Sequence, residues 1–467
     1  MIKNLTLRNF RAFRSEIFEF SKFNIFVGPN NSGKSSAISA INLIAQTFNN
    51  AEISQSPLVL NGLFDRLGTY LDLVHGNRSN TPLGIDISID DYAIKFDYKY
   101  RQQRREIELV KFQIDEKNKN AFSYESKKDS FSMKLMGKDV ESLQPFVRKR
   151  RPQFYRLIPT LRFSSTISHS PDMQEAPTNV RNILFSADRA LMRARSQLTK
   201  TFGDFDSLGP FRDRPERTYL YSGEVAQRIG TTGSNMALML ASDTSKRGAE
   251  SQNIIDEISR WFKISGIAEQ VRVKSLTPRH FELVLADVNG NEQNICDVGF
   301  GCSQVMPVLA ASLNMFSGND SISSFKSPTL IVQGPEIHLH PNAQASLGSF
   351  FSRLMQSEGQ IFVETHSDNL VLRVARHVAD GTLKENDVKI FYVHKINGSP
   401  VVQNISITGN GRFQPEWPGG FFPQRQSESL NLAQAAFRKT TPEKKEAKQS
   451  KFKYPEEIRS NNDTVRD

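Results

Sequence analysis

The stretch that most constrains this chain is residues 23–36, FNIFVGPNNSGKSS. The apolar run from Phe23 to Val27 is typical of a buried strand, and residues 37–48 have the spacing of a helix. Between them, residues 28–35 have the spacing G-x-x-x-x-G-K-S of a phosphate-binding loop. A strand, a phosphate loop and a helix in this order predict an α/β fold that binds a nucleotide.

The residue types of this loop explain the prediction chemically. Its two glycines let backbone N–H groups turn inward around phosphates, and Lys34 reaches the β and γ phosphates. Ser35 offers its hydroxyl to Mg²⁺, and the helix directs its positive end at the anion. We therefore expect ATP and Mg²⁺ as cofactors. The residues expected to bind them here are Gly28, Asn30, Asn31, Ser32, Gly33, Lys34, Ser35 and Ser36.

The chain has 467 residues, more than one usual domain, so we expect two or three packed units. No stretch approaches the roughly 18 consecutive apolar residues of a membrane span. The start of the chain, MIKNLTLRNF, has polar residues where a signal peptide needs its apolar core. Cys296 and Cys302 are too few for a disulfide framework or a zinc site. These features predict a cytoplasmic protein.

The formal net charge is +10. Such an excess favours contact with nucleic acid or an acidic partner, but an ordinary solubilising surface explains it equally well. Two segments concentrate the cations: residues 147–156, VRKRRPQFYR, and residues 438–453.

In the first part of the chain, residues 2–20 alternate apolar and polar side chains over two strands, with Arg11 in the turn between them. Residues 84–136 repeat this alternation, which predicts an antiparallel sheet partly solvated on one face. The other predictions before residue 270 are a loop at 58–77, loops and short helices at 137–175, helices at 178–202 and 253–264, and a loop at 208–233.

From residue 270 onward, strands and helices alternate, which completes an α/β pattern. Strands are predicted at 271–276, 280–287, 294–298, 329–336, 360–368 and 388–394, with an edge pair near 399–408. Helices are predicted at 299–316, after a glycine turn, and at 341–355. The tail is polar, and we expect it to be mobile after residue 440.

Four separated pieces lie at predicted strand ends or helix starts, where ligands bind in open α/β sheets. They are the phosphate loop, GFGCSQ (299–304), VQGPE (332–336) and ETHS (364–367). Their order resembles the ABC-type ATPases of the RecF, SMC and OLD group over nearly the whole chain. The resemblance implies an ABC-type ATPase head with a mixed central sheet, an antiparallel β subdomain and an inserted helical or lid region.

A narrower resemblance is to a prokaryotic AAA-15-like family, known mainly as the ATPase halves of anti-phage defence systems such as Septu and PARIS. The segments that carry it are NFRAF, LVLNG, LGPFRDRPER, DVGFGCSQVMP, PEIHLHP, ETHSD and EWPGGFF. The last of these is the most specific to the family. The resemblance predicts an N-terminal lobe at 1–136, a helical or irregular insert at 137–268, a C-terminal lobe at 269–410 and a C-terminal segment with a basic tail at 411–467.

The resemblance also assigns site residues. The signature segment contains Gly299, Gly301, Ser303 and Gln304, and it would face the γ-phosphate bound to a second subunit. Head-to-tail dimers or larger assemblies, with ATP between the subunits, follow from this; the alternative is a simple helix cap. His366 matches the switch histidine that reads the γ-phosphate, and Arg11 of NFRAF belongs to the nucleotide site.

The chain departs from the family at the end of strand 329–336. The family usually has a glutamate that supports Mg²⁺ at the position of Gln333 and, next to it, the water-activating residue where this chain has Gly334. Loss of one preorganised catalytic group costs about 2.7 to 4 kcal/mol, so we expect slow ATP hydrolysis. Gln333 fits either natural degeneration or an engineered substitution. Glu336 and Glu364 are the candidates to compensate.

Two other types of site are not expected. His338 and His340 could form a metal pair, but they precede Pro341 and lack a nearby third ligand. His366, Ser367 and Asp368 could form a hydrolase triad, but neighbours on a strand point to opposite faces. The PEIHLHP segment is instead expected at the subunit contact.

The leading functional hypothesis is a regulatory ATPase of an anti-phage defence complex. It would hold a separate effector, expected to be a nuclease, in check until infection is sensed. After the last predicted ATPase strand, the chain is too short for the Toprim nuclease of OLD proteins. The alternative is a RecF-like DNA-repair ATPase that binds duplex ends through the basic segments, with strong salt dependence. A stand-alone metabolic ATPase has no pocket signature to support it.

Overall fold

The computed structural model describes residues 1–50, 57–78, 80–127, 130–144, 151–160, 176–246, 253–316, 327–417, 422 and 428–435. The chain divides into two compact units, Met1–Glu416 and Trp417–Asp467. Among the described residues, no helix is both long and apolar enough to span a membrane.

A mixed seven-stranded sheet lies at the centre of the first unit, in the order β12-β17-β18-β3-β19-β20-β21. The strands from β12 to β19 pair in parallel, and β20 and β21 add antiparallel pairs at one edge. β3 is buried along its whole length, as expected for a parallel strand covered on both faces. The bounds are β12 (Phe205–Leu208), β17 (Thr329–Gln333), β18 (Gln360–Glu364), β3 (Phe23–Val27), β19 (Val388–Ile396), β20 (Ser399–Ile407) and β21 (Phe413–Gln414).

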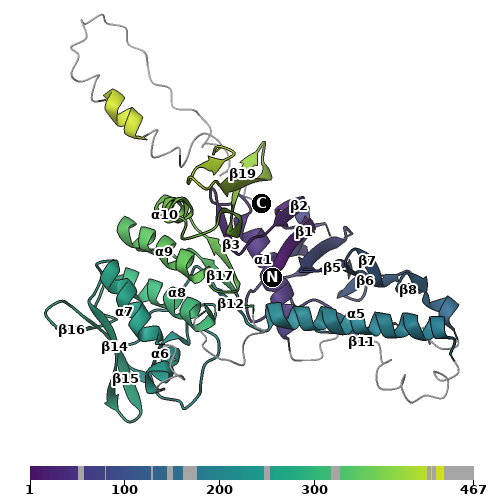
Figure 1. The fold of residues 1–467 in the computed structure, drawn as a ribbon, viewed down its shortest axis with the longest axis horizontal. Coiled ribbons are helices and arrows are strands. Elements are labelled where there is room, and N and C mark those ends of the chain that lie inside the picture. Colours follow the sequence, from purple (N-terminus) through teal and green to yellow (C-terminus); the bar gives the residue numbers. More distant parts are fainter. Residues whose placement is uncertain are drawn as a thin grey trace, which may run out of the picture. The chain divides into compact units, whose positions relative to one another are not determined.

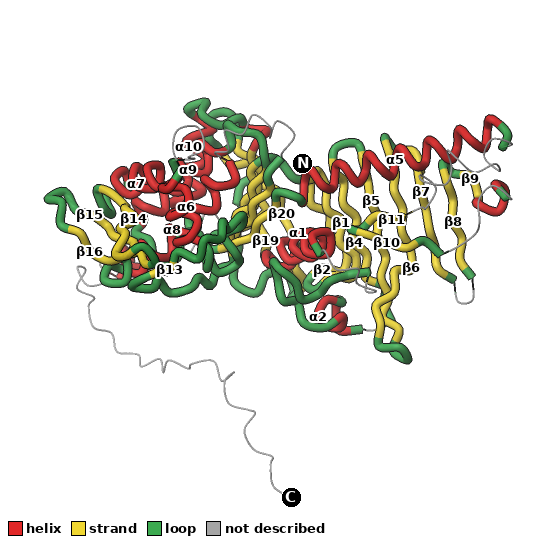
Figure 2. Tube along the Cα trace, turned by 90° about the horizontal axis from the view of Figure 1, so that it is seen from below, coloured by secondary structure: helices red, strands yellow, loops and turns green. Residues whose placement is uncertain are grey.

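Helices cover both faces of the central sheet. Figures 1 and 2 place α8, α9 and α10 on one face and α1 on the other. Ser367 begins α10, because its hydroxyl accepts a hydrogen bond from the Leu370 N–H. The helices that the structure describes in this unit are α1 (Lys34–Asn49), α5 (Thr178–Phe202), α6 (Met236–Ser245), α7 (Ile254–Ile264), α8 (Phe300–Phe316), α9 (Pro341–Leu354) and α10 (Asp368–Ala379), with a short α2 (Tyr70–Leu73).

An eight-stranded antiparallel sheet extends from the N-terminus, in the order β2-β1-β4-β5-β6-β7-β8-β9. α5 runs along it in both views (Figures 1 and 2), with Leu184, Leu191 and Leu198 buried at seven-residue spacing. Phe18 of β2 packs edge-on against Phe391 of β19, so one core joins the two sheets. The strands are β1 (Ile2–Phe10), β2 (Phe13–Glu19), β4 (Leu83–Ile89), β5 (Tyr92–Arg101), β6 (Glu106–Glu116), β7 (Lys119–Ser126), β8 (Phe131–Leu135) and β9 (Lys138–Asp139).

Smaller elements complete the first unit. β10 (Gln153–Tyr155) and β11 (Ile158–Thr160) form a hairpin. A further sheet has the order β13-β15-β14, with β16 paired to β15. Its strands are β13 (Tyr219–Leu220), β14 (Gln270–Thr277), β15 (His280–Ala286) and β16 (Glu292–Asn294); the 3-10 turns are η1 (His75–Asn77), η2 (Val140–Leu143) and η4 (Glu385–Asp387). In the second unit, the rings of Trp417 and Phe422 lie 6.0 Å apart, and residues 428–435 are helical.

The α/β prediction is confirmed, and the predicted helix at 178–202 coincides with α5. Three strand predictions need correction. β16 occupies Glu292–Asn294 and residues 295–297 form a turn, so the strand predicted at 294–298 is wrong. β18 ends at Glu364 and β17 at Gln333, both earlier than predicted. β17 stops because Gly334 adopts a φ of 55°, which ends an extended strand.

Several elements were missed from the sequence, among them β12, α6 and α10. Strands β9, β10 and β11 also lie within residues 137–175, where only loops and short helices were predicted. β12 has only four residues, and two of them, Asp206 and Ser207, are polar. Within residues 137–268, which the sequence predicts as an insert, α5 covers the eight-stranded sheet and β12 forms the edge of the central sheet. Residues 145–150, 161–175 and the tail after residue 440 lie outside the described residues.

Candidate functional site

The phosphate loop connects β3 to α1 in a backbone conformation that requires glycine at two positions. Gly28 has φ 142°, and a Cβ there would lie 2.0 Å from the Val393 carbonyl oxygen. Gly33 has φ 114°, and its Cβ would lie 3.1 Å from the Ala12 Cβ in the β1–β2 turn. Asn31 also has a positive φ, 58°. Because side chains are excluded, backbone N–H groups can face a bound anion.

Lys34 is held inside this loop. Its Nζ donates hydrogen bonds to the carbonyl oxygens of Gly28 (2.9 Å) and Pro29 (2.8 Å). Burial lowers the pKa of Lys34, although the charges of Glu364 and Glu336 act in the opposite direction. The hydroxyl of Ser32 is buried and has no hydrogen-bond partner in the described structure. A confined ammonium and an unpaired hydroxyl in a glycine-lined loop fit the oxygens of a polyphosphate.

At the carboxyl edge of the sheet, one carboxylate connects the phosphate loop to the strand ends. Ser35 Oγ donates to Glu364 Oε1 at 3.0 Å, and Gln333 Nε2 donates to Glu364 Oε2 at 3.1 Å. Gln333 and Glu364 are register partners on β17 and β18. The sequence assigned Ser35 and Gln333 to the metal, and the structure adds the carboxylate of Glu364 beside them.

A hydroxyl next to a carboxylate oxygen fits Mg²⁺ held by a nucleotide, because such an ion takes one or two protein ligands plus phosphate and water. Among the described residues, no group of three or more His, Cys, Asp or Glu side chains is arranged to hold a metal by itself. A metal at this edge would therefore need ligands from a bound nucleotide as well.

Glu336 and His366 lie at the same edge. Glu336 Oε1 accepts a hydrogen bond from the backbone N–H of His366 at 2.6 Å, so Glu336 fixes the turn after β18. Its Oε2 is buried and has no partner in the described structure. Burial and the positive charge of Lys34 lower the pKa of His366, and the carboxylates of Glu336 and Glu364 only partly offset this shift by raising it. The imidazole is therefore neutral at pH 7.

The structure also places Arg212 here, a residue that the sequence analysis did not assign. Its guanidinium donates to the carbonyl oxygens of Gln333 (2.7 Å) and Gly334 (3.1 Å). Burial lowers the pKa of Arg212 to about 10, and the charge of Glu336 partly opposes this shift. The only signal in the sequence was the family segment LGPFRDRPER, because no spacing connects residue 212 to residue 333.

Arg11 lies in the β1–β2 turn, as predicted from the sequence, beside the phosphate loop. Its Nη1 donates to Ser39 Oγ at 2.8 Å, and Ser39 Oγ donates to Asp65 Oδ2 at 3.0 Å. Ser35 and Ser39 are four residues apart and share one face of α1. Arg11 therefore contacts the face of α1 on which Ser35, the candidate Mg²⁺ ligand, also lies.

The signature segment, residues 299–304, forms the start of α8. A Cβ on Gly301 would lie 2.7 Å from the His338 carbonyl oxygen, whereas a Cβ on Gly299 would meet no atom within 4 Å. Phe300 is 59% exposed, and its ring centroid lies 6.1 Å from that of His338. Within the described residues, no hydrogen bond joins this segment to the phosphate loop of the same chain. Ser303 and Gln304 are buried in the first turns of α8.

The histidines and the serine considered for other sites have structural contacts. His338 has a positive φ of 63° in the turn after β17, and His340 Nδ1 accepts from the Asn342 N–H as the cap of α9. Ser367 Oγ donates to Gln344 Oε1 at 2.8 Å and caps α10. Ser367 is thus engaged away from His366, which agrees with the prediction that residues 366–368 form no triad.

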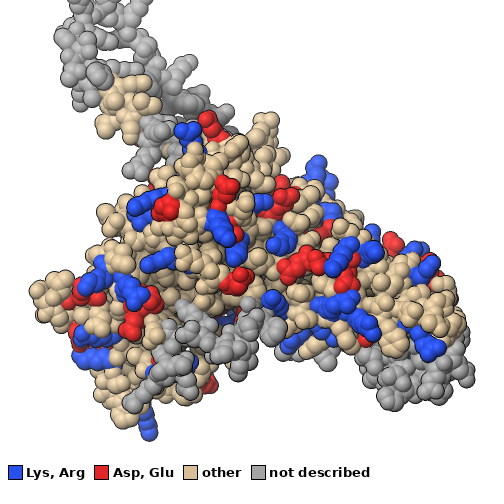
Figure 3. Space-filling view, viewed as in Figure 1, with Lys and Arg blue, Asp and Glu red and all other residues tan. Residues whose placement is uncertain are grey.

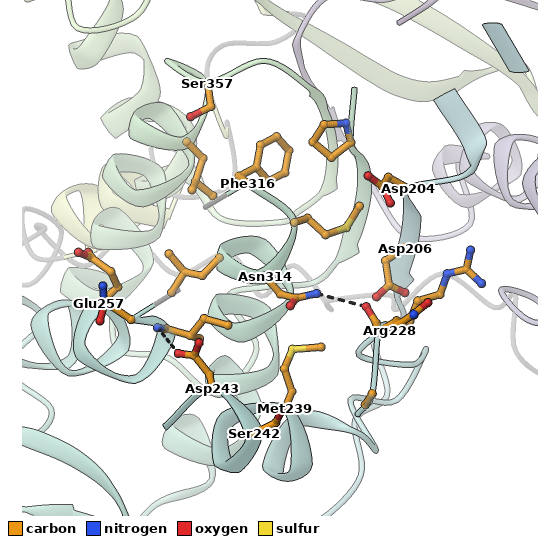
Figure 4. A pocket seen from close by; sticks show the side chains of 18 of the residues that line it. Asp204, Asp206, Arg228, Met239, Ser242, Asp243, Glu257, Asn314, Phe316 and Ser357 are labelled. Atoms are coloured by element: carbon orange, nitrogen blue, oxygen red, sulfur yellow. Dashed lines mark hydrogen bonds between the residues drawn. The ribbon is translucent and has the colours of Figure 1, made fainter. Parts of the chain in front are cut away.

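A separate cavity of about 1230 Å³ lies among β12, α6, α7, α8 and α9. Figure 4 shows carboxylates, Arg228 and apolar side chains facing it. Asp206 accepts a hydrogen bond from the Ile229 N–H, and burial raises the pKa of its carboxyl group. Neither the phosphate loop nor the strand ends at Gln333 and Glu364 line this cavity. It is therefore separate from the candidate nucleotide site.

Comparison with known proteins gives two family matches. Residues 1–208 and 216–371 match the family described as AAA ATPase domain. Residues 383–432 match a family described as protein of unknown function, DUF3696. No curated protein matches the sequence at a significant level.

Solved structures of SMC heads are similar to the chain. A head bound to the C-winged helix domain of ScpA has 14% identity, coverage of 87% of this chain and 98% of that chain, and a TM-score of 0.38. The SMC head domain from Thermotoga maritima has 11% identity, coverage of 86% and 98%, and a TM-score of 0.36. A Pyrococcus furiosus head with an extended coiled coil, bound to the C-terminal domain of ScpA, has 14% identity, coverage of 93% and 99%, and a TM-score of 0.35.

Proposed function

Since the chain belongs to the AAA ATPase domain family, we propose that it is a regulatory ATPase that binds ATP with Mg²⁺ and self-associates around the nucleotide. One observation carries the proposal. Lys34 and Ser35 of the phosphate loop meet Gln333, Glu364 and His366 at the carboxyl edge of one sheet. Ligands bind at this edge in open α/β sheets.

Each residue has a role that its position supports. Lys34 exchanges its two carbonyl acceptors for β- and γ-phosphate oxygens, and the loop N–H groups surround them. Ser35 supplies a hydroxyl to the cation, which neutralises phosphate charge when bound. His366, held neutral and close to Lys34, reads the γ-phosphate as a hydrogen-bonding group. Arg11 supports the helix face below the loop.

Hydrolysis is proposed to be slow. Position 333 carries an amide and position 334 has no side chain, so neither can take a proton from water. Glu336 uses one oxygen to hold the backbone of His366. ATP binding and ATP turnover are therefore separable, because Lys34 and the loop amides act on the bound ground state.

Self-association is proposed to place the signature segment on the nucleotide of a second copy. The open side of Gly299 and the exposed ring of Phe300 support this role, since both leave the start of α8 accessible. The N-terminus of α8 presents backbone N–H groups suited to an anion. Gly301 is packed on His338, so the PEIHLHP turn fixes this surface.

Sedimentation velocity tests this step directly. With ATP and Mg²⁺ the chain should sediment as a dimer or larger assembly, and Lys34→Ala should remain in the nucleotide-free state. Lys111→Ala, an exposed lysine on β6, is the matched control. The same sedimentation with and without ATP would refute nucleotide-driven assembly.

The biological role that we propose is control of a separate effector, expected to be a nuclease, in an anti-phage defence complex in the cytoplasm. Support comes from the segments PEIHLHP, ETHSD and EWPGGFF and their resemblance to that group of ATPases. Co-expression with the protein encoded next to it is the test. A neighbour that neither binds the chain nor changes phage growth would contradict this role.

The RecF-like alternative has less support. Of the basic segment 147–156, the structure describes residues 151–156, and Arg151 and Arg156 lie over the rings of Phe131 and Phe48. On the face shown in Figure 3, described cations and carboxylates are interspersed. DNA affinity that falls steeply with salt would favour this alternative over the defence role.

A further inference from the structure

The carboxylate expected at position 333 has a counterpart on the neighbouring strand. Gln333 and Glu364 end β17 and β18 as register partners in a parallel pair, so their side chains lie on the same side of the sheet. Glu364 is the residue whose carboxylate bridges Gln333 and Ser35. A negative group thus faces the phosphate loop although β17 ends in an amide.

The distance between the two oxygen atoms fits a metal. Mg²⁺ binds oxygen at about 2.0–2.1 Å in octahedral geometry, which separates adjacent ligands by about 2.9 Å. Ser35 Oγ and Glu364 Oε1 lie 3.0 Å apart. Both can therefore bind one ion with little movement, once the serine proton no longer points at the carboxylate. Ser35 is exposed and Glu364 is partly exposed, so the ion has access.

Gln333 orients the carboxylate of Glu364. Its amide donates to Oε2, which leaves Oε1 directed at Ser35. A glutamate at 333 would place two carboxylates about as close as this hydrogen bond, with no donor between them. The amide at 333 instead supplies a donor that holds the carboxylate of Glu364 in place.

The other carboxylate at this edge is engaged elsewhere. Glu336 Oε1 accepts from the His366 N–H, and the residue is only 9% exposed. Turning it toward Ser35 would leave that N–H without its acceptor. Glu364 is therefore the better placed of the two candidates that the sequence offered.

We propose that Glu364 is the acidic protein ligand of the nucleotide-bound Mg²⁺, next to Ser35, in place of a carboxylate at position 333. The proposal rests on the proposed ATP binding. It concerns this chain's metal ligand, so it can fail while nucleotide binding stands.

The test measures Mn²⁺ as a probe of the magnesium site, by electron paramagnetic resonance, with a non-hydrolysable ATP analogue bound to the full chain. Three variants are compared with the wild type: Glu364→Gln, the exchanged pair Gln333→Glu with Glu364→Gln, and the control Glu106→Gln on the exposed start of β6. Metal-free ATP binding in EDTA is measured in parallel for each protein.

Glu364→Gln should weaken Mn²⁺ binding by roughly tenfold or more, while Glu106→Gln changes it little. The exchanged pair should recover most of the lost Mn²⁺ affinity, because it places a carboxylate on the neighbouring strand, at position 333. The proposal would be overturned if Glu364→Gln bound Mn²⁺ as tightly as the wild type. It would also be overturned if the exchanged pair bound Mn²⁺ as weakly as Glu364→Gln alone. Absence of ATP binding to the wild type in EDTA and in Mg²⁺ would instead refute the proposed function.

Discussion

The side-chain amide of Gln333 donates a 3.1 Å hydrogen bond to the carboxylate of Glu364, its register partner on the neighbouring parallel strand. The same carboxylate accepts a hydrogen bond from the Ser35 hydroxyl of the phosphate loop. One acidic group therefore links the loop to the end of β17, at the point where Mg²⁺ would bind. The arrangement supports cation binding and leaves the water-activating position 334 without a side chain.

The first prediction concerns turnover. The wild type should hydrolyse ATP more slowly than about 1 per second, the lower part of the usual enzyme range. If Gln333 blocks hydrolysis, Gln333→Glu should strengthen Mg²⁺ coordination and raise turnover by roughly tenfold or more. Phosphate release at saturating ATP measures both, with Gln102→Glu in the exposed β5–β6 turn as control.

One result would contradict slow turnover, and another would decide why Gln333 is present. A wild-type rate at or above about 1 per second would show that another carboxylate activates water. Little effect of Gln333→Glu would indicate a natural loss of hydrolysis and a protein that only senses ATP.

Arg212 should stabilise the end of β17. Replacing Arg212 by Met removes the donors to the carbonyl oxygens of Gln333 and Gly334, which lie in a partly buried place. Unsatisfied buried groups cost about 1–3 kcal/mol, so the free energy of unfolding should fall by this amount. Arg217→Met, at an exposed ion pair with Asp297, should change it by less than about 1 kcal/mol. Urea denaturation measures both variants. Equal denaturation midpoints for Arg212→Met and Arg217→Met would argue against a stabilising role of Arg212.

The two signature glycines should respond differently to alanine. Gly301→Ala forces a Cβ toward the His338 carbonyl oxygen, 2.7 Å away, and should lower the unfolding free energy by about 1–3 kcal/mol. Gly299→Ala meets open space and should change stability by less than about 0.5 kcal/mol. It should nevertheless weaken ATP-dependent assembly, if this surface meets a second copy. Normal assembly by Gly299→Ala, measured by sedimentation, would count against that contact.

His366 should make stability depend on pH. Its pKa in the folded chain lies below the ordinary value of 6.5, because of burial and Lys34. The unfolded chain therefore binds this proton more readily, so stability falls as the pH drops through 6.5 toward the lower folded value. The wild type should lose more unfolding free energy than His366→Gln between pH 7.5 and 5.5, a window that we choose to span this pKa. Equal losses of unfolding free energy in the two proteins would show that the pKa of His366 is not lowered by folding.

Much of the site follows from local sequence, and the rest does not. The phosphate loop was predictable because its glycines, lysine and serine act within eight consecutive positions. The pairing of Gln333 with Glu364 depends on the register of two strands separated by α9, which no spacing in the sequence fixes. Arg212 reaches the end of β17 from a loop 121 residues away.

The strand errors have a similar origin. β12 was missed because its polar Asp206 and Ser207 hide a buried edge strand; Asp206 accepts a hydrogen bond from the backbone of Ile229. The segment 294–298 resembled a strand in composition, but residues 295–297 form a turn. β18 was predicted to extend to residue 368, although Ser367 is the cap of α10. In each case, tertiary contacts outweigh local propensity.

Equilibrium binding of ATP to the Lys34→Ala variant tests the central claim most directly. Lys34 is the cation inside the loop, where its ammonium group donates hydrogen bonds to the carbonyl oxygens of Gly28 and Pro29. By isothermal titration calorimetry, the wild type and Lys111→Ala should bind ATP with the same affinity, and Lys34→Ala should show no binding. Unchanged ATP affinity in Lys34→Ala would contradict the assignment of the nucleotide site.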